Sequence, residues 1–390
     1  MKIIICGGGI TGLSTYLYLR KHLPGTNRVT LYESHRPRID NVEGPLTSPY
    51  PHQAILNLDR LSASTALVGG RLGISPNGMR VLRDLSGDLH DRVIAQGFPA
   101  EKFVFKGANG WTLGVQSTSD KAVRAQNDHA EVCIASSRHG LWQTILRYAQ
   151  ETYGGGVVRY RKVVTVERMQ SGGIEVRSID ENGNEEADEA DLVIGADGVK
   201  SVVRKALFGD EPRCQPSYTL RINRELPHWA NKGLVLIGDA AHAMDPTTGQ
   251  GASQALEDSQ TLALLLGELF KDSRDVGPVA ATVEIAIEQL HQIRAPRIHA
   301  IVQRGKKLAG RKVNIGVIAE YFMYFFLWLL NRSPTLGNHA LTQFPRCYTN
   351  FVKGKIVLGD VNQELYTWSA ADEVKKAQAP GVAKICARST

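Results

Sequence analysis

Cysteine is scarce in this sequence, and its spacing excludes a disulfide framework. Cys6, Cys133, Cys214, Cys347 and Cys386 are the five cysteines among 390 residues, and no two of them form a CxxC pair. An odd, widely spaced set is typical of a reducing compartment, so we expect a cytoplasmic protein. The eleven histidines show no ligand spacing either, and we expect no metal site.

Clustered charge is also missing. The 46 basic and 39 acidic side chains leave a formal net charge of +7, spread along the chain. Without a dense run of Lys and Arg, we expect no nucleic-acid partner. The sequence has no internal repeat, and we expect no cleaved leader, because the first expected strand begins at Lys2. A length of 390 residues and an ordinary composition favour two interleaved globular domains.

The first residues predict a strand, a glycine turn and a helix. In "KIIICGGGITGLSTYLYLRK" (residues 2–21) the positions before the turn are all apolar, as expected of a central parallel strand. The turn is a full GxGxxG, in which Gly7 permits a tight turn and Gly9 lets the backbone approach a pyrophosphate. Gly12 lets the helix pack close to the strand. The pattern therefore predicts a dinucleotide site.

A second strand, "RVTLYE", ends in Glu33, 21 positions after Gly12. An acid at that place can accept hydrogen bonds from an adenosine ribose. A glycine turn beside a surface glutamate is the alternative. The order of strand, loop, helix, strand and terminal acid favours the nucleotide site.

Two later strands, 192–195 and 234–237, are each followed by an acid, Asp197 and Asp239. Because ligands collect at the carboxyl ends of parallel strands, we expect both acids beside the first glycine loop. A second glycine loop then opens a helix at Gly251 and Ala252, and the positive end of that helix can face an electron-rich ring. One dinucleotide with a bulky second half, FAD, explains both loops.

Other segments are assigned by pattern. The Pro- and Ser-rich residues 37–64 are expected to form a long excursion. A helix is expected to open near Pro76, strands to lie within 103–115 and 132–135, and an amphipathic helix to begin at Arg138 and share Leu141, Ile145 and Ala149 on one face. The acidic run 180–191 is expected to form a solvated hairpin, with an Asn-Gly turn just after its start.

Four motifs resemble those of the class A FAD-dependent monooxygenases, similar to para-hydroxybenzoate and salicylate hydroxylase. They are "GGGITG" with Glu33, "GGRLGISPNGMRVL", "LVIGADGVKSVVR" and "VLIGDAAHAMDPTTGQGASQALED". The residues after 310 resemble the apolar extension of fungal secondary-metabolite members. The FAD contacts that the resemblance implies are Gly7, Gly9, Gly12, Glu33, Gly70, Arg138, Asp197, Asp239, Gly251 and Ala252.

The resemblance also implies an activity. NADPH would reduce FAD, and O2 would form a flavin C4a-hydroperoxide that hydroxylates or epoxidises an apolar or aromatic small molecule, such as a secondary metabolite. His242, in "GDAAH", is expected to be structural. No catalytic acid or base is assigned.

The expected fold is α/β: a Rossmann-like FAD-binding domain with a parallel sheet, a reduced antiparallel substrate domain and a helical C-terminal tail. The FAD-binding domain is assigned to three segments, the substrate domain to two and the tail to one. In chain order they are 1–77 (FAD), 78–132 (substrate), 133–211 (FAD), 212–231 (substrate), 232–266 (FAD) and 267–390 (tail).

The sequence departs from the family between its two acids. Asp239 follows Asp197 by only 42 positions, whereas the family places a whole antiparallel sheet there. After one helix the interval has room for about one or two strands. The chain is a natural variant, a product that lost an exon, or a flavin scaffold with another task. The alternative to a monooxygenase is therefore an FAD-binding protein with lost or altered redox activity. Arg71, where the family often has glycine, would crowd the flavin or reach a phosphate.

The tail contains an apolar stretch of 18 residues, 313–330, interrupted by Asn314 and Glu320. A spanning helix needs about 20 apolar residues, so a buried or surface-docked helix is favoured. Its aromatic residues suit peripheral membrane contact, a cap over an apolar substrate, or cover for a surface that the missing sheet exposes. They are Tyr321, Phe322, Tyr324, Phe325, Phe326 and Trp328.

Overall fold

The structure is a computed structural model. It describes residues 1–36, 70–106, 110, 112–118, 130–170, 172–209, 214–216, 221–223, 225–272, 279–309, 321–322, 324–325, 365–366 and 368–377. The excursion expected at 37–64 and most of the stretch 313–330 lie outside the described residues.

The centre of the fold is a six-stranded sheet in the order β15-β16-β12-β1-β2-β8. Five strands are parallel, and only the edge strand β15 runs antiparallel to its neighbour. This sheet confirms the predicted α/β class. The strands are β1 (Lys2–Cys6), β2 (Arg28–Glu33), β8 (Val158–Tyr160), β12 (Leu192–Gly195), β15 (Ala230–Asn231) and β16 (Leu234–Leu236).

The parallel sheet is buried on both faces, which explains why its strands are continuously apolar. Successive side chains of a strand point to opposite faces. Ile3 and Ile5 of β1 therefore join one hydrophobic cluster with the helices α1 and α7, while Ile4 and Cys6 join a second cluster with the antiparallel strands and α5. The sheet thus separates two cores.

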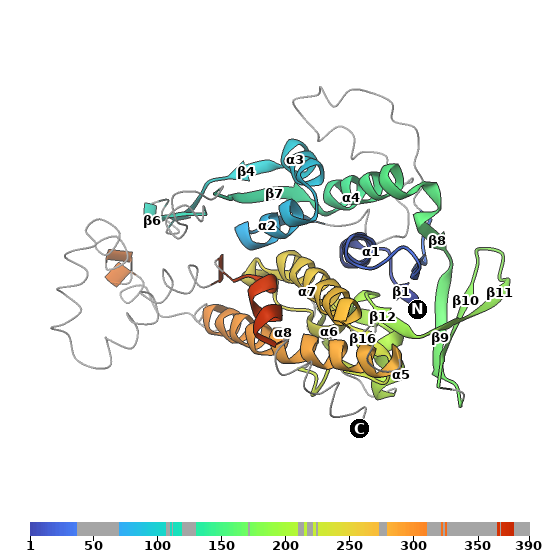
Figure 1. The fold of residues 1–390 in the computed structure, drawn as a ribbon. Coiled ribbons are helices and arrows are strands. Elements are labelled where there is room, and N and C mark those ends of the chain that lie inside the picture. The colour runs from blue at the N-terminus through green and yellow to red at the C-terminus, as the bar shows by residue number, and fades with distance from the viewer. Residues whose placement is uncertain are drawn as a thin grey trace.

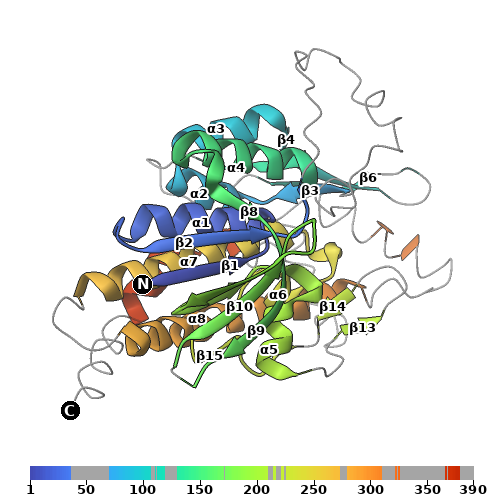
Figure 2. The same cartoon turned by 90° about the vertical axis from the view of Figure 1, so that its right-hand side faces the viewer.

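Helices cover one face, and an antiparallel sheet with a short helix covers the other (Figures 1 and 2). Helices α1 and α7 pack against each other, and α8 packs along α7. The helices are α1 (Ile10–His22), α2 (Pro76–Leu85), α3 (Gly87–Gln96), α4 (Arg138–Tyr153), α5 (Val202–Phe208), α6 (Asp239–His242), α7 (Gly251–Asp272) and α8 (Val279–Ala309).

Four smaller antiparallel sheets complete the described fold. Strand β7 pairs with β3 and β4, and this sheet forms a layer with α2, α3 and α4 above α1 and α7 in Figure 1. The acidic run forms the predicted hairpin β10–β11, which pairs with β9. The strands are β3 (Arg71–Ile74), β4 (Phe98–Ala100), β5 (Lys102–Lys106), β6 (Thr112–Ser117), β7 (Cys133–Ser137), β9 (Lys162–Arg168), β10 (Ile174–Ile179), β11 (Glu185–Ala190), β13 (Cys214–Pro216) and β14 (Arg221–Asn223).

The described residues of the short interval between the two acids form small elements. Helix α5 is followed by the pair β13–β14, with three residues in each strand, and then by β15. The antiparallel pair β13–β14 agrees with the prediction of one or two strands after this helix. The two-residue strand β15 was not expected, because its pairing with β16 depends on the turn at Lys232 and Gly233, both of which have positive φ.

The helices α2 and α4 also follow the predictions. Helix α2 begins at Pro76, and Leu141, Ile145 and Ala149 of α4 are all fully buried. The domain boundaries stay predictions, and α7 runs across the one proposed between 266 and 267.

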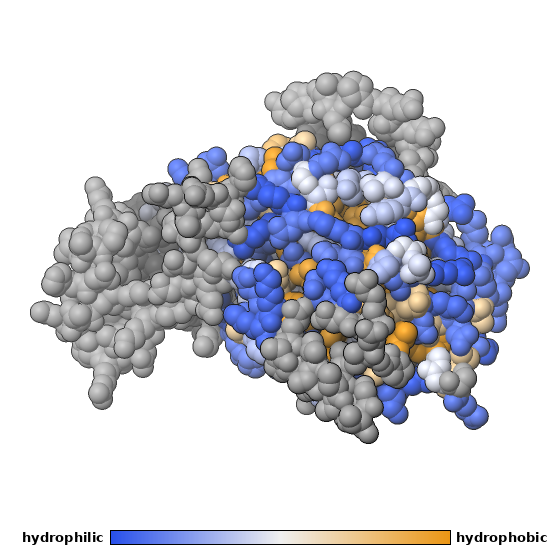
Figure 3. Space-filling model, in the orientation of Figure 1, coloured by the Kyte–Doolittle hydropathy of each residue, from blue (hydrophilic) through white to orange (hydrophobic). Residues whose placement is uncertain are grey.

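The described surface in Figure 3 is mainly hydrophilic, with hydrophobic residues in separate small areas. None of the described helices is long and apolar enough to cross a membrane. Tyr321, Phe322 and Phe325 are exposed in the few tail residues that the structure describes. Peripheral membrane contact through 313–330 stays a prediction.

Candidate functional site

The first glycine loop fits its surroundings only because it lacks side chains. Gly7 has a φ of 103°, and a β-carbon there would lie 2.5 Å from the carbonyl oxygen of Ala196. A β-carbon on Gly12 would overlap the carbonyl oxygen of Gly7. A β-carbon on Gly9, by contrast, would meet no atom of the described residues within 4 Å. Two glycines are therefore needed for packing, and Gly9 leaves open space at the start of α1.

Glu33 and Trp142 hold the two peptide groups on either side of the Gly8 α-carbon. The backbone N–H of Gly8 donates to Glu33 Oε2 at 2.8 Å. The indole N–H of Trp142, on α4, donates to the carbonyl oxygen of Gly8 at 2.8 Å. Glu33 thus lies where the sequence placed it, beside the loop. The sequence did not predict the role of Trp142. The one indication available is general: a buried indole N–H needs a hydrogen-bond acceptor.

The strand-end acid Asp197 adjoins the glycine loop. A β-carbon on Gly7 would lie 2.8 Å from Asp197 Cα. Asp197 Oδ2 accepts the backbone N–H of Val202 at 2.6 Å at the start of α5, while Oδ1 has no hydrogen-bond partner among the described residues. Burial raises the pKa of this carboxyl group. Asp197 thus has a buried acceptor oxygen whose hydrogen-bonding capacity the described residues leave unused.

The second acid, Asp239, opens α6 directly after Gly238. Gly238 has a φ of 58°, and a β-carbon there would lie 2.7 Å from Thr11 Oγ1 in the first glycine loop. The loops that follow β1, β12 and β16 therefore converge, as expected for the carboxyl ends of parallel strands.

The motif at 69–82 closes the same region from the antiparallel layer. Gly70 and Arg138 lie together, because the backbone N–H of Arg138 donates to the carbonyl oxygen of Gly70 at 3.3 Å. Gly78 of α2 packs so closely that a β-carbon would lie 2.7 Å from Ser253 Oγ on α7. The side chain of Arg71 lies outside the described part of the structure, so neither of its predicted roles is tested.

The second glycine loop ends in a buried amide that joins α2 to α7. Gln250 Nε2 donates to Ser75 Oγ at 2.8 Å, and Gln250 Oε1 accepts from Asn77 and Gln254, each at 3.2 Å. Helix α7 then begins with no acidic residue in its first turn. A β-carbon on Gly251 would meet no described atom within 4 Å. Among the described residues, the positive end of this long helix therefore lies beside open space at Gly251.

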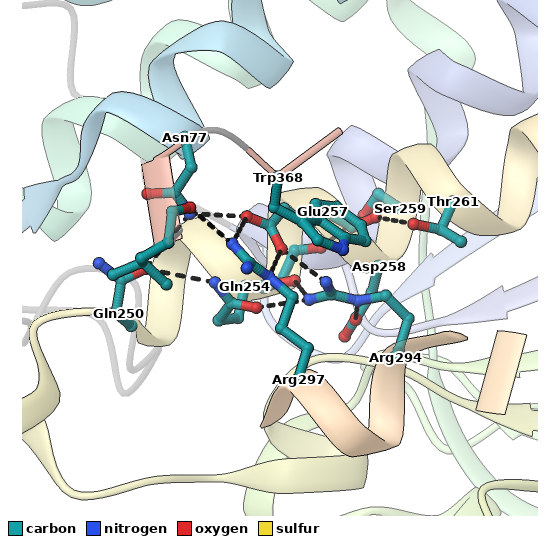
Figure 4. Close-up of polar contacts among 12 residues, drawn as sticks. Asn77, Gln250, Gln254, Glu257, Asp258, Ser259, Thr261, Arg294, Arg297 and Trp368 are labelled. Carbon is teal, nitrogen blue, oxygen red and sulfur yellow. Dashed lines mark hydrogen bonds and ion pairs between the residues drawn. The ribbon is translucent and has the colours of Figure 1, made fainter. Parts of the chain in front are cut away.

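A buried charge network lies directly behind this helix start (Figure 4). Arg294 of α8 donates to Asp258 Oδ1 at 2.7 Å and to Glu257 Oε2 at 2.5 Å. Arg297 donates to both oxygens of Glu257, each at 2.8 Å. Burial by itself would raise the pKa of Asp258, but His242 and Arg294 outweigh it and lower the pKa to about 2. Both carboxylates are therefore ionised and paired.

His242 belongs to this network, in agreement with its predicted structural role. Its Nε2 lies 2.6 Å from Asp258 Oδ2, which also accepts the backbone N–H of Gly238 at 2.9 Å. Asp258 thus ties α7 to the loop that carries Asp239. Sequence reasoning missed Asp258 and Arg294, because their partners are remote in the chain.

The site so assembled can bind a ligand that is extended and polar along one side. Its described groups are open backbone at two helix starts and the acceptor oxygen of Asp197. Among the described residues, no group of three or more His, Cys, Asp or Glu side chains could hold a metal ion.

Comparisons with known proteins agree with this geometry. A family model described as "FAD binding domain" matches residues 55–222 and 220–303. The chain is 31% identical over 132 residues to the FAD-dependent monooxygenase janM of Penicillium janthinellum, which covers 33% of this chain and 28% of that protein. It is 47% identical over 98 residues to the salicylate hydroxylase of Pseudomonas putida, covering 23% of this chain and 22% of that protein. The chain thus matches less than a third of each curated relative.

Solved structures share the fold. Klebsiella pneumoniae HpxO, complexed with FAD and uric acid, has a TM-score of 0.60 and 16% identity, over 84% of this chain and 92% of that one. P. aeruginosa PqsL, in complex with 2-aminobenzoylacetate, has a TM-score of 0.58 and 18% identity, over 83% and 99%.

Proposed function

Because the chain belongs to the FAD binding domain family, we propose that it is a monooxygenase that binds FAD and uses NADPH and O2. Its substrate would be an apolar or aromatic small molecule, which it hydroxylates or epoxidises. The names of its curated relatives, FAD-dependent monooxygenases of fungi and a bacterial salicylate hydroxylase, support this class of reaction.

The observation that carries the proposal is the convergence of three strand-end loops, together with open space beside two helix starts. Gly7 adjoins Asp197, Gly238 adjoins Thr11, and open space lies at Gly9 and Gly251 among the described residues. A dinucleotide needs such backbone at its pyrophosphate and acceptor oxygens for its sugar hydroxyls. The residues that would hold FAD are Gly7, Gly9, Gly12, Glu33, Gly70, Arg138, Asp197, Asp239, Gly251 and Ala252.

FAD would supply the electron transfer and the oxygen chemistry when bound. The chain's own residues would bind and orient it. Glu33 and Asp239 would accept hydrogen bonds from hydroxyl groups, and the start of α7 would stabilise negative charge on the ring. Asp258, paired with His242 and Arg294, would fix the helix that does so.

A second candidate function is an FAD-binding protein with lost or altered redox activity. The observation that favours it is the three-residue length of β13 and β14, where the family resemblance implies a whole sheet over the substrate. A site with less cover admits water, which favours release of H2O2 over transfer of oxygen to a substrate.

The deciding experiment starts from purified protein loaded with FAD. Anaerobic addition of NADPH should bleach the flavin, and O2 with candidate phenols should then give hydroxylated product. Bleaching that yields only H2O2 would indicate a site open to water. Bound FAD that NADPH does not bleach would support the second candidate. A folded protein that takes up no FAD would contradict both.

A further inference from the structure

A short C-terminal segment, residues 365–366 and 368–377, docks onto the helices behind the candidate site. Arg297 donates to the carbonyl oxygen of Leu365 at 2.9 Å, and Arg80 of α2 donates to the carbonyl oxygens of Tyr366 and Trp368. Leu365 and Tyr366 are buried in one cluster with Ile301, against which Met244 packs. Met244 lies two residues after the end of α6, so this hydrophobic cluster joins the C-terminal segment to α8 and to the chain just beyond the second acid.

Trp368 places its ring over two guanidinium groups at once. The ring centroid lies 4.7 Å from Cζ of Arg294 and 4.6 Å from Cζ of Arg297. Their side chains are 0% and 10% exposed. Two buried cations beside each other repel, and Glu257 and Asp258 neutralise them from the side of α7. The electron-rich face of an indole attracts cations, and it covers this pair on another side (Figure 4).

Two hydrogen bonds connect Arg294 to the start of α7. Arg294 Nη2 donates to Gln254 Oε1 at 2.6 Å, and Gln254 Nε2 donates to Gln250 Oε1 at 3.2 Å. Gln250 immediately precedes the first residue of α7 and donates to Ser75, the N-cap residue of α2. Three contacts therefore connect the Trp368 ring to the turn where α7 begins.

We propose that Trp368 is a positioning residue: it holds Arg294 and Arg297 in place, and through them it fixes the first turn of α7 toward the flavin. This inference rests on the proposed function for the identity of the ligand. Trp368 acts through the two arginines and the Gln254–Gln250 pair. Without its ring, water reaches the guanidinium groups, Arg294 loses its fixed place, and the first turn of α7 loosens.

The test compares Trp368→Leu, which keeps apolar cover but lacks a π face, with Trp368→Phe, which keeps a ring. Trp368→Leu should weaken FAD binding about tenfold, since two cation–π contacts are lost, and should shift the flavin midpoint potential. Trp368→Phe should restore most of both. FAD binding is measured by flavin fluorescence, and the potential by dye-equilibrated reduction.

A readout without flavin separates this inference from the proposed function. In the FAD-free protein, amide hydrogen exchange at residues 251–255 should be faster in Trp368→Leu than in wild type. Lys376→Gln, which removes an exposed ion pair with Glu373 on the same segment, should change neither exchange nor FAD binding. The inference fails if Trp368→Leu leaves exchange in the first turn of α7 and the potential at wild-type values. If wild type binds no FAD, the proposed function fails, and the exchange comparison still decides the role of Trp368.

Discussion

A methyl group added at Gly12 would overlap the carbonyl oxygen of Gly7, whereas one added at Gly9 would meet no described atom within 4 Å. We therefore expect two alanine substitutions in this loop to act differently, one on stability and the other on FAD binding. Gly12→Ala should lower the free energy of unfolding of the FAD-free protein by about 1–3 kcal/mol or more, through overpacking. Gly9→Ala should cost at most about 1 kcal/mol, yet weaken FAD binding at least about tenfold. Urea unfolding and FAD titration check the pair, and wild-type FAD affinity in Gly9→Ala would contradict the pyrophosphate assignment.

The two acids assigned to hydroxyl groups give a second prediction at this scale. Glu33→Ala and Asp239→Ala should each weaken FAD binding by about 1–3 kcal/mol, because a ligand donor loses its acceptor. Glu33→Ala also removes the acceptor of the Gly8 N–H, so Glu33→Gln, which keeps an acceptor oxygen, is its control. The measurement is the dissociation constant of FAD. Unchanged affinity in both alanine variants would show that neither residue contacts the cofactor.

At the scale of elements, the contact between α2 and α7 ties two distant motifs into one site. Gln250 bridges the helices at the start of α7, and Gln260 bridges them farther along, where its Nε2 donates to Asp84 Oδ2 at 3.1 Å. Both side chains are buried. One bridge lies at the candidate site and the other away from it, so Gln260 can serve as a control for Gln250.

We predict that Gln250→Ala lowers the free energy of unfolding by about 1–3 kcal/mol, since it leaves the buried Ser75, Asn77 and Gln254 short of a partner. Gln260→Ala should cost less, because Asp84 is exposed and water can replace the lost donor. Only Gln250→Ala should also weaken FAD binding markedly, because only Gln250 orients the first turn of α7. Thermal unfolding of the FAD-free proteins and FAD titration separate the two effects. Equal losses of affinity in the two variants would mean that the junction acts through stability alone.

At the scale of the whole molecule, the charge network makes stability depend on acid pH. Asp258 has a pKa of about 2 in the fold, below the value of about 3.9 for an unfolded chain. The folded state thus stabilises the ionised form of Asp258 more than the unfolded chain does. The stabilisation is complete above about pH 4 and is lost as the pH falls from about 4 to about 2.

The corresponding experiment measures urea unfolding between about pH 5 and pH 2. Wild type should lose stability more steeply than Asp258→Asn, by up to about 1.4 kcal/mol per pH unit, because one fewer proton is taken up by the variant on unfolding. Asp258→Asn should be less stable than wild type at neutral pH, since Arg294 loses a buried partner. Parallel pH curves for the two proteins would show that Asp258 is not held ionised by its neighbours.

The sequence by itself determined the elements that depend on neighbours in the chain. An apolar run followed by GxGxxG predicted β1, its turn and α1, because backbone freedom at Gly7 and close packing at Gly12 are local requirements. The acids at the ends of β2, β12 and β16 could be placed for the same reason: parallel strands end at one edge. Helix α4 followed from the spacing of its apolar residues, and the 42-position interval predicted few strands after α5.

Only the tertiary structure decided which distant residues meet. Trp142 on Gly8, Arg294 between Asp258 and Glu257, and the ring of Trp368 over both arginines join positions that are tens to hundreds of residues apart. No period or motif marks such partners, since a buried indole N–H or guanidinium can donate to any acceptor that the fold presents, and a guanidinium can also pack against any ring. A charge is stable in the core only when such partners surround it, and the packing of α2, α7, α8 and the C-terminal segment supplies them.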